Sequence, residues 1–167
     1  LSPSKKLSKQ LKKKLKIKKK VYYVANPIIR KKYKYKKIKK IFDFINIASI
    51  TNQKDHITLL KALKLAVIKN NKLQLLIIGE GRLKKQIRIY IKINMLNKNV
   101  ILLNNKTNID YYLKRSKLFI LSSRYEGYPN VLLDAAANNL PIISSNCNFG
   151  PSEILSKGKY GKLFNVG

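Results

Sequence analysis

The feature that most constrains this chain is a regular alternation of strand-like and helix-like segments from residue 41 onward. Short runs rich in isoleucine, leucine, valine and phenylalanine alternate with segments whose apolar residues recur at helical spacing. Strands are predicted near residues 42–49, 73–79, 99–104, 117–122, 140–145 and 161–166, and helices near residues 55–69, 82–96, 108–115, 130–138 and 151–156. Right-handed crossovers between such units place helices on both faces of one parallel sheet. The chain is therefore predicted to be α/β, with a Rossmann-like doubly wound parallel sheet whose ligand lies beyond the carboxyl ends of the strands.

One strand–turn–helix unit, residues 118–137, carries the most chemical information. An apolar run predicts a buried strand, glycine and proline mark a turn, and a short helix begins near Pro129. This order directs free backbone N–H groups at one point, where an anion binds well. Glu126 lies in the turn and Asp134 about one helical turn past Asn130, so both carboxylates can border the same opening. The spacing alone leaves open that the two acids are neighbours without a shared role.

Residues 126–154 read EGYPNVLLDAAANNLPIISSNCNFGPSEI, which resembles the signature of retaining nucleotide-sugar glycosyltransferases of family 4, enzymes with the GT-B fold. Residues 46–56, 75–81 and 159–164 resemble further motifs of that family, in the family's order. The resemblance covers roughly residues 18–167. It implies that residues 41–167 are the nucleotide-sugar-binding, Rossmann-like half of a GT-B fold, truncated at both ends. Residues 1–40 would be a basic helix and an interdomain connector, the remnant of the N-terminal half.

The resemblance also implies an activity in glycan biosynthesis. The chain would contribute donor binding to a glycosyltransferase of the hexosyltransferase type, which moves a sugar from a nucleoside-diphosphate sugar to a hydroxyl of a glycan or lipid-linked acceptor. The isolated chain is expected to be incomplete, because the acceptor site belongs to the other half. The resemblance assigns the catalytic role to Glu126, beside the donor sugar. It assigns donor binding to Ser49, Lys54, Gly127, Tyr128, Pro129, Asn130, Val131 and Asp134. It implies neither a metal nor a cofactor besides the donor substrate.

The chain departs from the family pattern at two of these positions. Ser49 stands where the family has an arginine, and Asp134 stands where it has a glutamate. Lys54 precedes a predicted helix, where a cation opposes the helix dipole, and this placement indicates an anionic partner. Asn104 stands near the family's nucleobase pocket, where glycine is common. These departures keep open the alternative of a degenerate, non-catalytic fragment.

A formal net charge of +30 suggests a different class of function, a basic module that binds nucleic acid or a membrane surface. Residues 1–40 hold 18 basic side chains and no acidic one. Leucines recur at helical spacing in residues 1–20, so a basic helix there could rest on an anionic membrane, or could have one packed edge and one solvated face. Aromatic residues interleave with lysine only at Tyr33 and Tyr35, which argues against nucleic acid. Lysine, isoleucine, asparagine and tyrosine also form about half the chain, a bias that an A/T-rich coding sequence produces without selection for any partner.

Three further residues are predicted to have structural rather than catalytic roles. His56, the only histidine, is expected on the surface of its helix, and Cys147, the only cysteine, is expected to be structural. Glu153 is expected to stabilise the start of its own short helix. One histidine and one cysteine predict no metal cluster. A single cysteine fits a reducing compartment, and no apolar run is long enough to cross a membrane, so the predicted location is the cytoplasm, with a peripheral position at the inner face of the membrane left open.

Overall fold

A computed structural model describes residues 2–14, 22–24, 26 and 38–167 of the chain. Its centre is one six-stranded sheet in which all neighbouring strands are parallel. The strands are β1 (Phe42–Ile47), β2 (Leu75–Ile78), β3 (Val100–Leu103), β4 (Ser116–Leu121), β5 (Ile142–Ser145) and β6 (Lys162–Phe164). Their order is β3-β2-β1-β4-β5-β6, so the chain reverses its direction of travel across the sheet between β1 and β4. The loops that follow these two strands therefore flank the switch point, where such sheets bind ligands.

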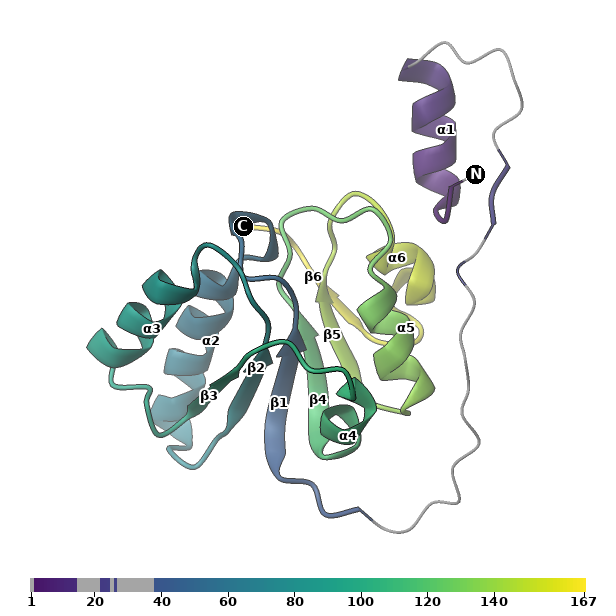
Figure 1. The fold of residues 1–167 in the computed structure, drawn as a ribbon. Coiled ribbons are helices and arrows are strands. Elements are labelled where there is room, and N and C mark those ends of the chain that lie inside the picture. The colour runs from purple at the N-terminus through teal and green to yellow at the C-terminus, as the bar shows by residue number, and fades with distance from the viewer. Residues whose placement is uncertain (1, 15–21, 25, 27–37) are drawn as a thin grey trace.

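Five helices cover the two faces of this sheet (Figure 1). Helices α2 (His56–Lys69) and α3 (Lys84–Ile93) lie on one face, and α4 (Ile109–Lys114), α5 (Asn130–Ala137) and α6 (Pro151–Ile154) lie on the other. Side chains alternate along each strand: Leu75 and Ile77 belong to the core on the α2–α3 side, while Leu76 and Ile78 belong to the other core. Every predicted strand and helix from residue 41 onward is found within three residues of its predicted ends. The predicted Rossmann-like, doubly wound α/β fold is confirmed.

Two glycines bring the loops after β1 and β2 together. A Cβ atom on Gly79 would lie 2.0 Å from the carbonyl oxygen of Ala48, and one on Gly81 would lie 2.3 Å from that of Ile50. The Ile50 N–H donates to the carbonyl of Glu80 at 2.7 Å, which fastens the first loop to the second. Only glycine permits this approach, and it fixes the path of the chain toward residues 52–54, the short 3₁₀ turn η1 (Asn52–Lys54).

Helix α1 (Lys5–Lys14) lies outside the sheet, above α6 (Figure 1). Glu153 holds it there, because its carboxylate accepts hydrogen bonds from Ser4 Oγ at 2.6 Å and from the backbone N–H groups of Lys5 and Lys6 at 2.9 and 3.1 Å. The expectation for Glu153 is thereby corrected: it lies in the first turn of α6, but its oxygens cap the start of α1. The buried residue of α1 is Ser8, and Leu7 and Leu11 are half-buried. Leu15, the third of the leucines whose helical spacing predicted this helix (Leu7, Leu11 and Leu15), lies outside the described residues, as do residues 29–37 of the predicted connector.

Candidate functional site

The loops that follow β1 and β4 are tied to each other at the carboxyl edge of the sheet. Ser122 Oγ donates to the backbone carbonyl of Lys54 at 2.8 Å. The Arg124 N–H donates to the carbonyl of Gln53 at 2.8 Å, and Gln53 Nε2 donates to the carbonyl of Tyr125 at 2.9 Å. Three hydrogen bonds between segments about 70 residues apart therefore set the relative position of the two loops.

A buried ion pair lies within this frame. Lys54 Nζ is 2.5 Å from Glu126 Oε1, and only 18% and 6% of the two side chains are exposed. Ser123 Oγ donates to the same carboxylate oxygen at 2.6 Å. A buried carboxylate is tolerable only when it is paired and hydrogen-bonded, and Glu126 meets both conditions. The anionic partner that the position of Lys54 indicates is, in this structure, Glu126.

A second ion pair stands beside the first and was not foreseen from the sequence. Arg124 Nε lies 3.0 Å from Asp55 Oδ2, and the other oxygen of Asp55 accepts the N–H of Thr58, which caps the start of α2. Burial raises the pKa of Asp55, but the hydrogen bonds from Arg124 and Thr58 outweigh it, and the pKa lies below its ordinary value. The signal that could have found this cap is an aspartate directly before a helix.

The start of α5 lies at the same edge. Pro129 is buried and directly precedes the helix, while Gly127 and Asn130 are exposed. Gly150 supports this turn closely: a Cβ atom on it would lie 2.5 Å from Pro129 Cδ and 3.0 Å from the Gly127 carbonyl oxygen. Asn130 Oδ1 accepts a hydrogen bond from Asn26 Nδ2 at 2.5 Å. The first N–H groups of a helix have no partner within it, so this exposed turn can present donors to a ligand; Val131, the next residue, is half-buried.

Asp134 lies one turn into α5, as predicted, and is half-buried. Burial raises its pKa, and the negative charge of Asp110 on α4 raises it further. Asn138 Nδ2 donates to Asp110 Oδ1 at 2.9 Å, which holds the second acid in place. Within the described part of the chain, no hydrogen bond joins Asp134 to Glu126. The structure therefore brings Glu126 to Lys54, and leaves Asp134 on the side of α5 that faces α4.

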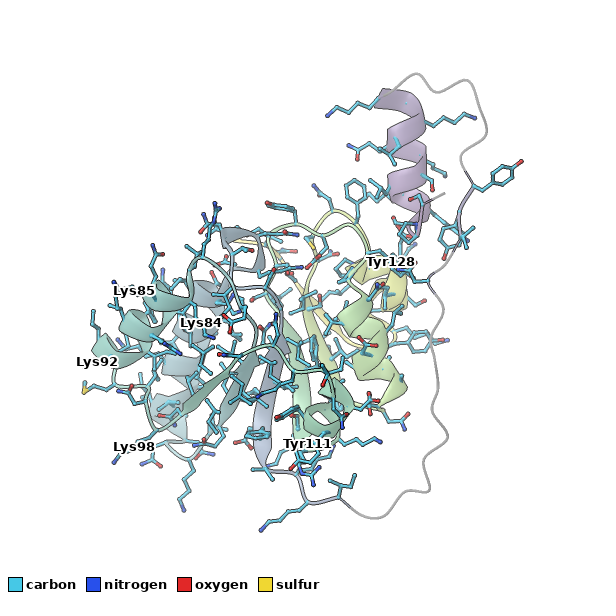
Figure 2. All side chains as sticks on the ribbon, viewed as in Figure 1. Lys84, Lys85, Lys92, Lys98, Tyr111 and Tyr128 are labelled. Atoms are coloured by element: carbon cyan, nitrogen blue, oxygen red, sulfur yellow. The ribbon has the colours of Figure 1, made fainter. Side chains whose placement is uncertain are left out.

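The remaining predicted residues border the same edge. Ser49 is exposed in the loop after β1, and its carbonyl accepts the N–H of Thr51 at 3.0 Å. Tyr128 is half-buried and lies near the lower end of α1 (Figure 2). Burial raises its pKa, and its interactions with Tyr23 and Glu153 act in the same direction.

Lys84, which the sequence analysis did not identify as a candidate, connects the loops after β2 and β3. Lys84 Nζ lies 2.6 Å from Glu80 Oε1 in the loop after β2 and also donates to Asn104 Oδ1 in the loop after β3 (Figure 2 labels Lys84). Asn104 is exposed, and its side chain is held by this contact.

The expectation for His56 is wrong. It is 2% exposed, and neither ring nitrogen has a hydrogen-bond partner among the described residues. Burial lowers its pKa to about 4, against the opposing charge of Asp55. The reason is its surroundings: the first residue of α2 lies among apolar side chains of other elements, Ile50, Leu83 and Ile87, which line the same pocket of about 160 Å³. Thr51 also lines this pocket, and its hydroxyl lacks a partner in the described chain.

Cys147 is buried, and burial raises the pKa of its thiol. In the described ranges, no three His, Cys, Asp or Glu side chains are grouped so that they could hold a metal ion. No helix in those ranges has the length and apolar character needed to cross a membrane.

Comparison with known proteins gives one consistent family. A family model described as "Glycosyl transferases group 1" matches residues 27–167. An uncharacterized glycosyltransferase of Methanocaldococcus jannaschii is 39% identical over 137 residues, which are 81% of this chain and 33% of that protein. The N-acetylgalactosamine-N,N'-diacetylbacillosaminyl-diphospho-undecaprenol 4-alpha-N-acetylgalactosaminyltransferase of Campylobacter jejuni is 29% identical over 122 residues, 73% of this chain and 33% of that protein. The chain thus spans about a third of the length of these relatives.

Solved structures agree on the fold. The pneumococcal O-GlcNAc transferase GtfA, in complex with UDP and GlcNAc, superposes with a TM-score of 0.84 at 20% identity, over 96% of this chain and 32% of that one. A mutant of TarM from Staphylococcus aureus, in a complex that contains UDP, gives a TM-score of 0.80 at 24% identity, over 90% and 31% of the two chains. The fold of this chain is therefore that of one Rossmann-like half of a GT-B protein.

Proposed function

Since the chain belongs to the glycosyl transferases of group 1, we propose that it is the donor-binding half of a retaining enzyme. Joined to an N-terminal half, it would transfer a sugar from a nucleoside-diphosphate sugar to a hydroxyl of a glycan or lipid-linked acceptor. The observation that carries this proposal is the buried Lys54–Glu126 pair at the switch point of the sheet, next to the exposed start of α5. The two structural neighbours described above are both complexes with UDP, which supports the choice of donor class.

Each side chain has a separate proposed role. The diphosphate binds the N–H groups at the turn and start of α5, and competes with Glu126 for the ammonium group of Lys54. Glu126, released from part of its ion pair, lies beside the transferred sugar, and Asp134 accepts hydrogen bonds from the ribose hydroxyls. Ser49 offers one hydrogen bond in place of the family's arginine. The loss of a charge-assisted contact costs about 1.5–3 kcal/mol, so we expect weak donor affinity in the isolated chain.

The negative charge that develops on the departing diphosphate needs stabilisation in the transition state. Lys54 supplies a fixed positive charge, and the start of α5 supplies oriented N–H groups, which together form a preorganised electrostatic site. We therefore propose that transfer requires no metal and no cofactor besides the donor. Chelation with EDTA should leave nucleoside diphosphate binding unchanged.

Calorimetric titration with UDP, ADP and GDP tests the proposal. Removing Lys54 alone leaves Glu126 buried without its partner, so the comparison is made in a Glu126→Gln background. We expect saturable, base-selective binding to Glu126→Gln, and binding at least about tenfold weaker to Lys54→Met/Glu126→Gln. Lys98→Met/Glu126→Gln, which alters an exposed lysine on the far side of the fold, is the matched control and should behave like Glu126→Gln. Absence of saturable binding in the unaltered chain would support the degenerate fragment instead.

A further inference from the structure

A second opening, of about 920 Å³, lies between α1 and the segment that follows β5. One wall is formed by α1 and the other by residues 146–150, α6 and the 3₁₀ turn η2 (Ser156–Gly158). We call it the α1 pocket. Its charged lining residues are four lysines and one glutamate: Lys5, Lys6, Lys9, Lys157 and Glu153.

The charge of this pocket is strongly positive. Glu153 is fully engaged with the start of α1, as described above. Lys5 Nζ lies 5.3 Å from the centre of the Tyr23 ring, and Lys6 Nζ lies 5.8 Å from that of Phe149. Within the described ranges, none of the four lysines forms an ion pair with a carboxylate. The single carboxylate of the pocket, Glu153, attracts Lys5 but cannot neutralise four lysines, so the concavity keeps an excess of positive charge that suits a multiply charged anion.

The α1 pocket adjoins the proposed donor site. Gly150 lines the pocket and packs closely against the turn at Gly127 and Pro129. Cys147 lines it as well, and the charges of Glu126 and Lys54 act on the thiol of Cys147. The pocket therefore lies next to the turn at which the proposed function places the donor sugar.

We propose that the α1 pocket binds a phosphate-bearing group of the acceptor and so positions that acceptor for transfer. This inference rests on the proposed function, because an acceptor is defined only by the transfer reaction. Lysine ammonium groups bind phosphate as point charges, and four of them suit a diphosphate or closely spaced phosphates. Such a group could come from a lipid-linked diphosphate or from a phosphate-containing glycan. Each ammonium contact with phosphate is charge-assisted, so its removal weakens binding measurably.

Titration with inorganic pyrophosphate, alone and in saturating UDP, tests this assignment. Lys9 and Lys157 are exposed, so Lys9→Gln/Lys157→Gln should fold normally, which thermal unfolding checks. The matched control is Lys92→Gln/Lys98→Gln, two exposed lysines remote from α1 (Figure 2). We expect pyrophosphate affinity to fall at least about tenfold in the pocket variant and to stay unchanged in the control. UDP affinity should be the same in all three proteins.

Three results would overturn the proposal. An equal loss of pyrophosphate binding in both double variants would mean that only overall charge matters. If saturating UDP abolishes the part of pyrophosphate binding that depends on Lys9 and Lys157, the pocket belongs to the donor site. RNA that binds the pocket lysines more tightly than pyrophosphate does would assign the pocket to nucleic acid. The proposed function fails separately, if UDP binds none of the proteins whatever pyrophosphate does.

Two further probes separate the sources of the phosphate. Binding to phosphatidylcholine vesicles that carry a polyprenyl diphosphate, lost in the pocket variant, would identify a lipid-linked acceptor. Binding of soluble poly(glycerol phosphate), lost in the same variant, would identify a phosphate-containing glycan. Pyrophosphate binding without binding of either carrier would contradict the acceptor assignment.

Discussion

The two cationic regions at the carboxyl edge of the sheet differ in how their charges are neutralised. Between the loops after β1 and β4, each cation meets a carboxylate: Lys54 pairs with Glu126, and Arg124 pairs with Asp55. In the α1 pocket, four lysines face one glutamate whose oxygens are already engaged. A ligand must therefore replace a partner in the first region, but would supply one in the second. The excess of lysine in this composition leaves unneutralised positive charge where the fold gathers four lysines around one carboxylate.

The largest expected effect is on stability in the first region. Lys54→Met leaves the carboxylate of Glu126 buried and unpaired, and should lower the free energy of unfolding by about 4 kcal/mol. Adding Glu126→Gln should recover most of this loss. Lys9→Met, in the α1 pocket, should change stability by less than about 0.5 kcal/mol. Urea denaturation of the single and double variants measures all three changes in the free energy of unfolding. Equal losses for Lys54→Met and Lys9→Met would contradict the difference between the two regions.

A second effect concerns His56, a buried polar side chain next to the first region but without a partner among the described residues. Burial lowers its pKa from the ordinary 6.5 to about 4. Between these two pH values His56 is therefore protonated in the unfolded chain but neutral in the folded chain. Folding stability should therefore decline between pH 6.5 and pH 4, by about 3 kcal/mol. His56→Leu should remove this part of the pH dependence. Denaturation at a series of pH values compares the two proteins, and identical slopes would show that His56 is not the cause.

A smaller effect concerns the contact that forms the α1 pocket. Glu153→Ala removes the acceptor for Ser4 and for the first N–H groups of α1, a loss of about 1 kcal/mol for a helix cap. Hydrogen exchange of the Lys5 and Lys6 amides should accelerate, while exchange in β1 and β4 should not change. Unaltered protection of α1 would mean that another contact holds it.

The smallest effect is at Asp134. Its raised pKa means that the folded chain holds a proton that the unfolded chain releases, so the ionised group destabilises the fold at neutral pH. Asp134→Asn should stabilise the chain by about 0.5 kcal/mol at pH 7, an amount that vanishes as both states become protonated at low pH. The same change should weaken UDP binding, because one of the two oxygens that accept from the ribose hydroxyls becomes an NH2 donor and the negative charge is lost. Urea denaturation of this variant should show the gain in stability, and titration should show the loss of UDP affinity.

The sequence predicted the sheet and helices because both are local patterns: short apolar runs for buried strands, helical spacing of apolar residues, and glycine or proline at the turns. The parallel topology also predicted that the loops after the strands meet at the carboxyl edge of the sheet. The two wrong expectations concern contacts made across long stretches of chain. Glu153 binds a helix start 148 residues earlier, and His56 is covered by the loop after β1, the start of α3 and Arg124 after β4. The ion pair of Lys54 with Glu126 was equally non-local, and only the two loops, not their contact, could be predicted.

The most direct test of the central claim is a UDP titration of isotope-labelled residues 1–167, followed by backbone amide signals. If the nucleotide's phosphates bind the turn and start of α5, the signals of Lys54, Gly127, Tyr128, Asn130 and Val131 shift most and saturate together. Signals of α1 should move little. Shifts confined to α1, or none that saturate at the start of α5, would contradict the account.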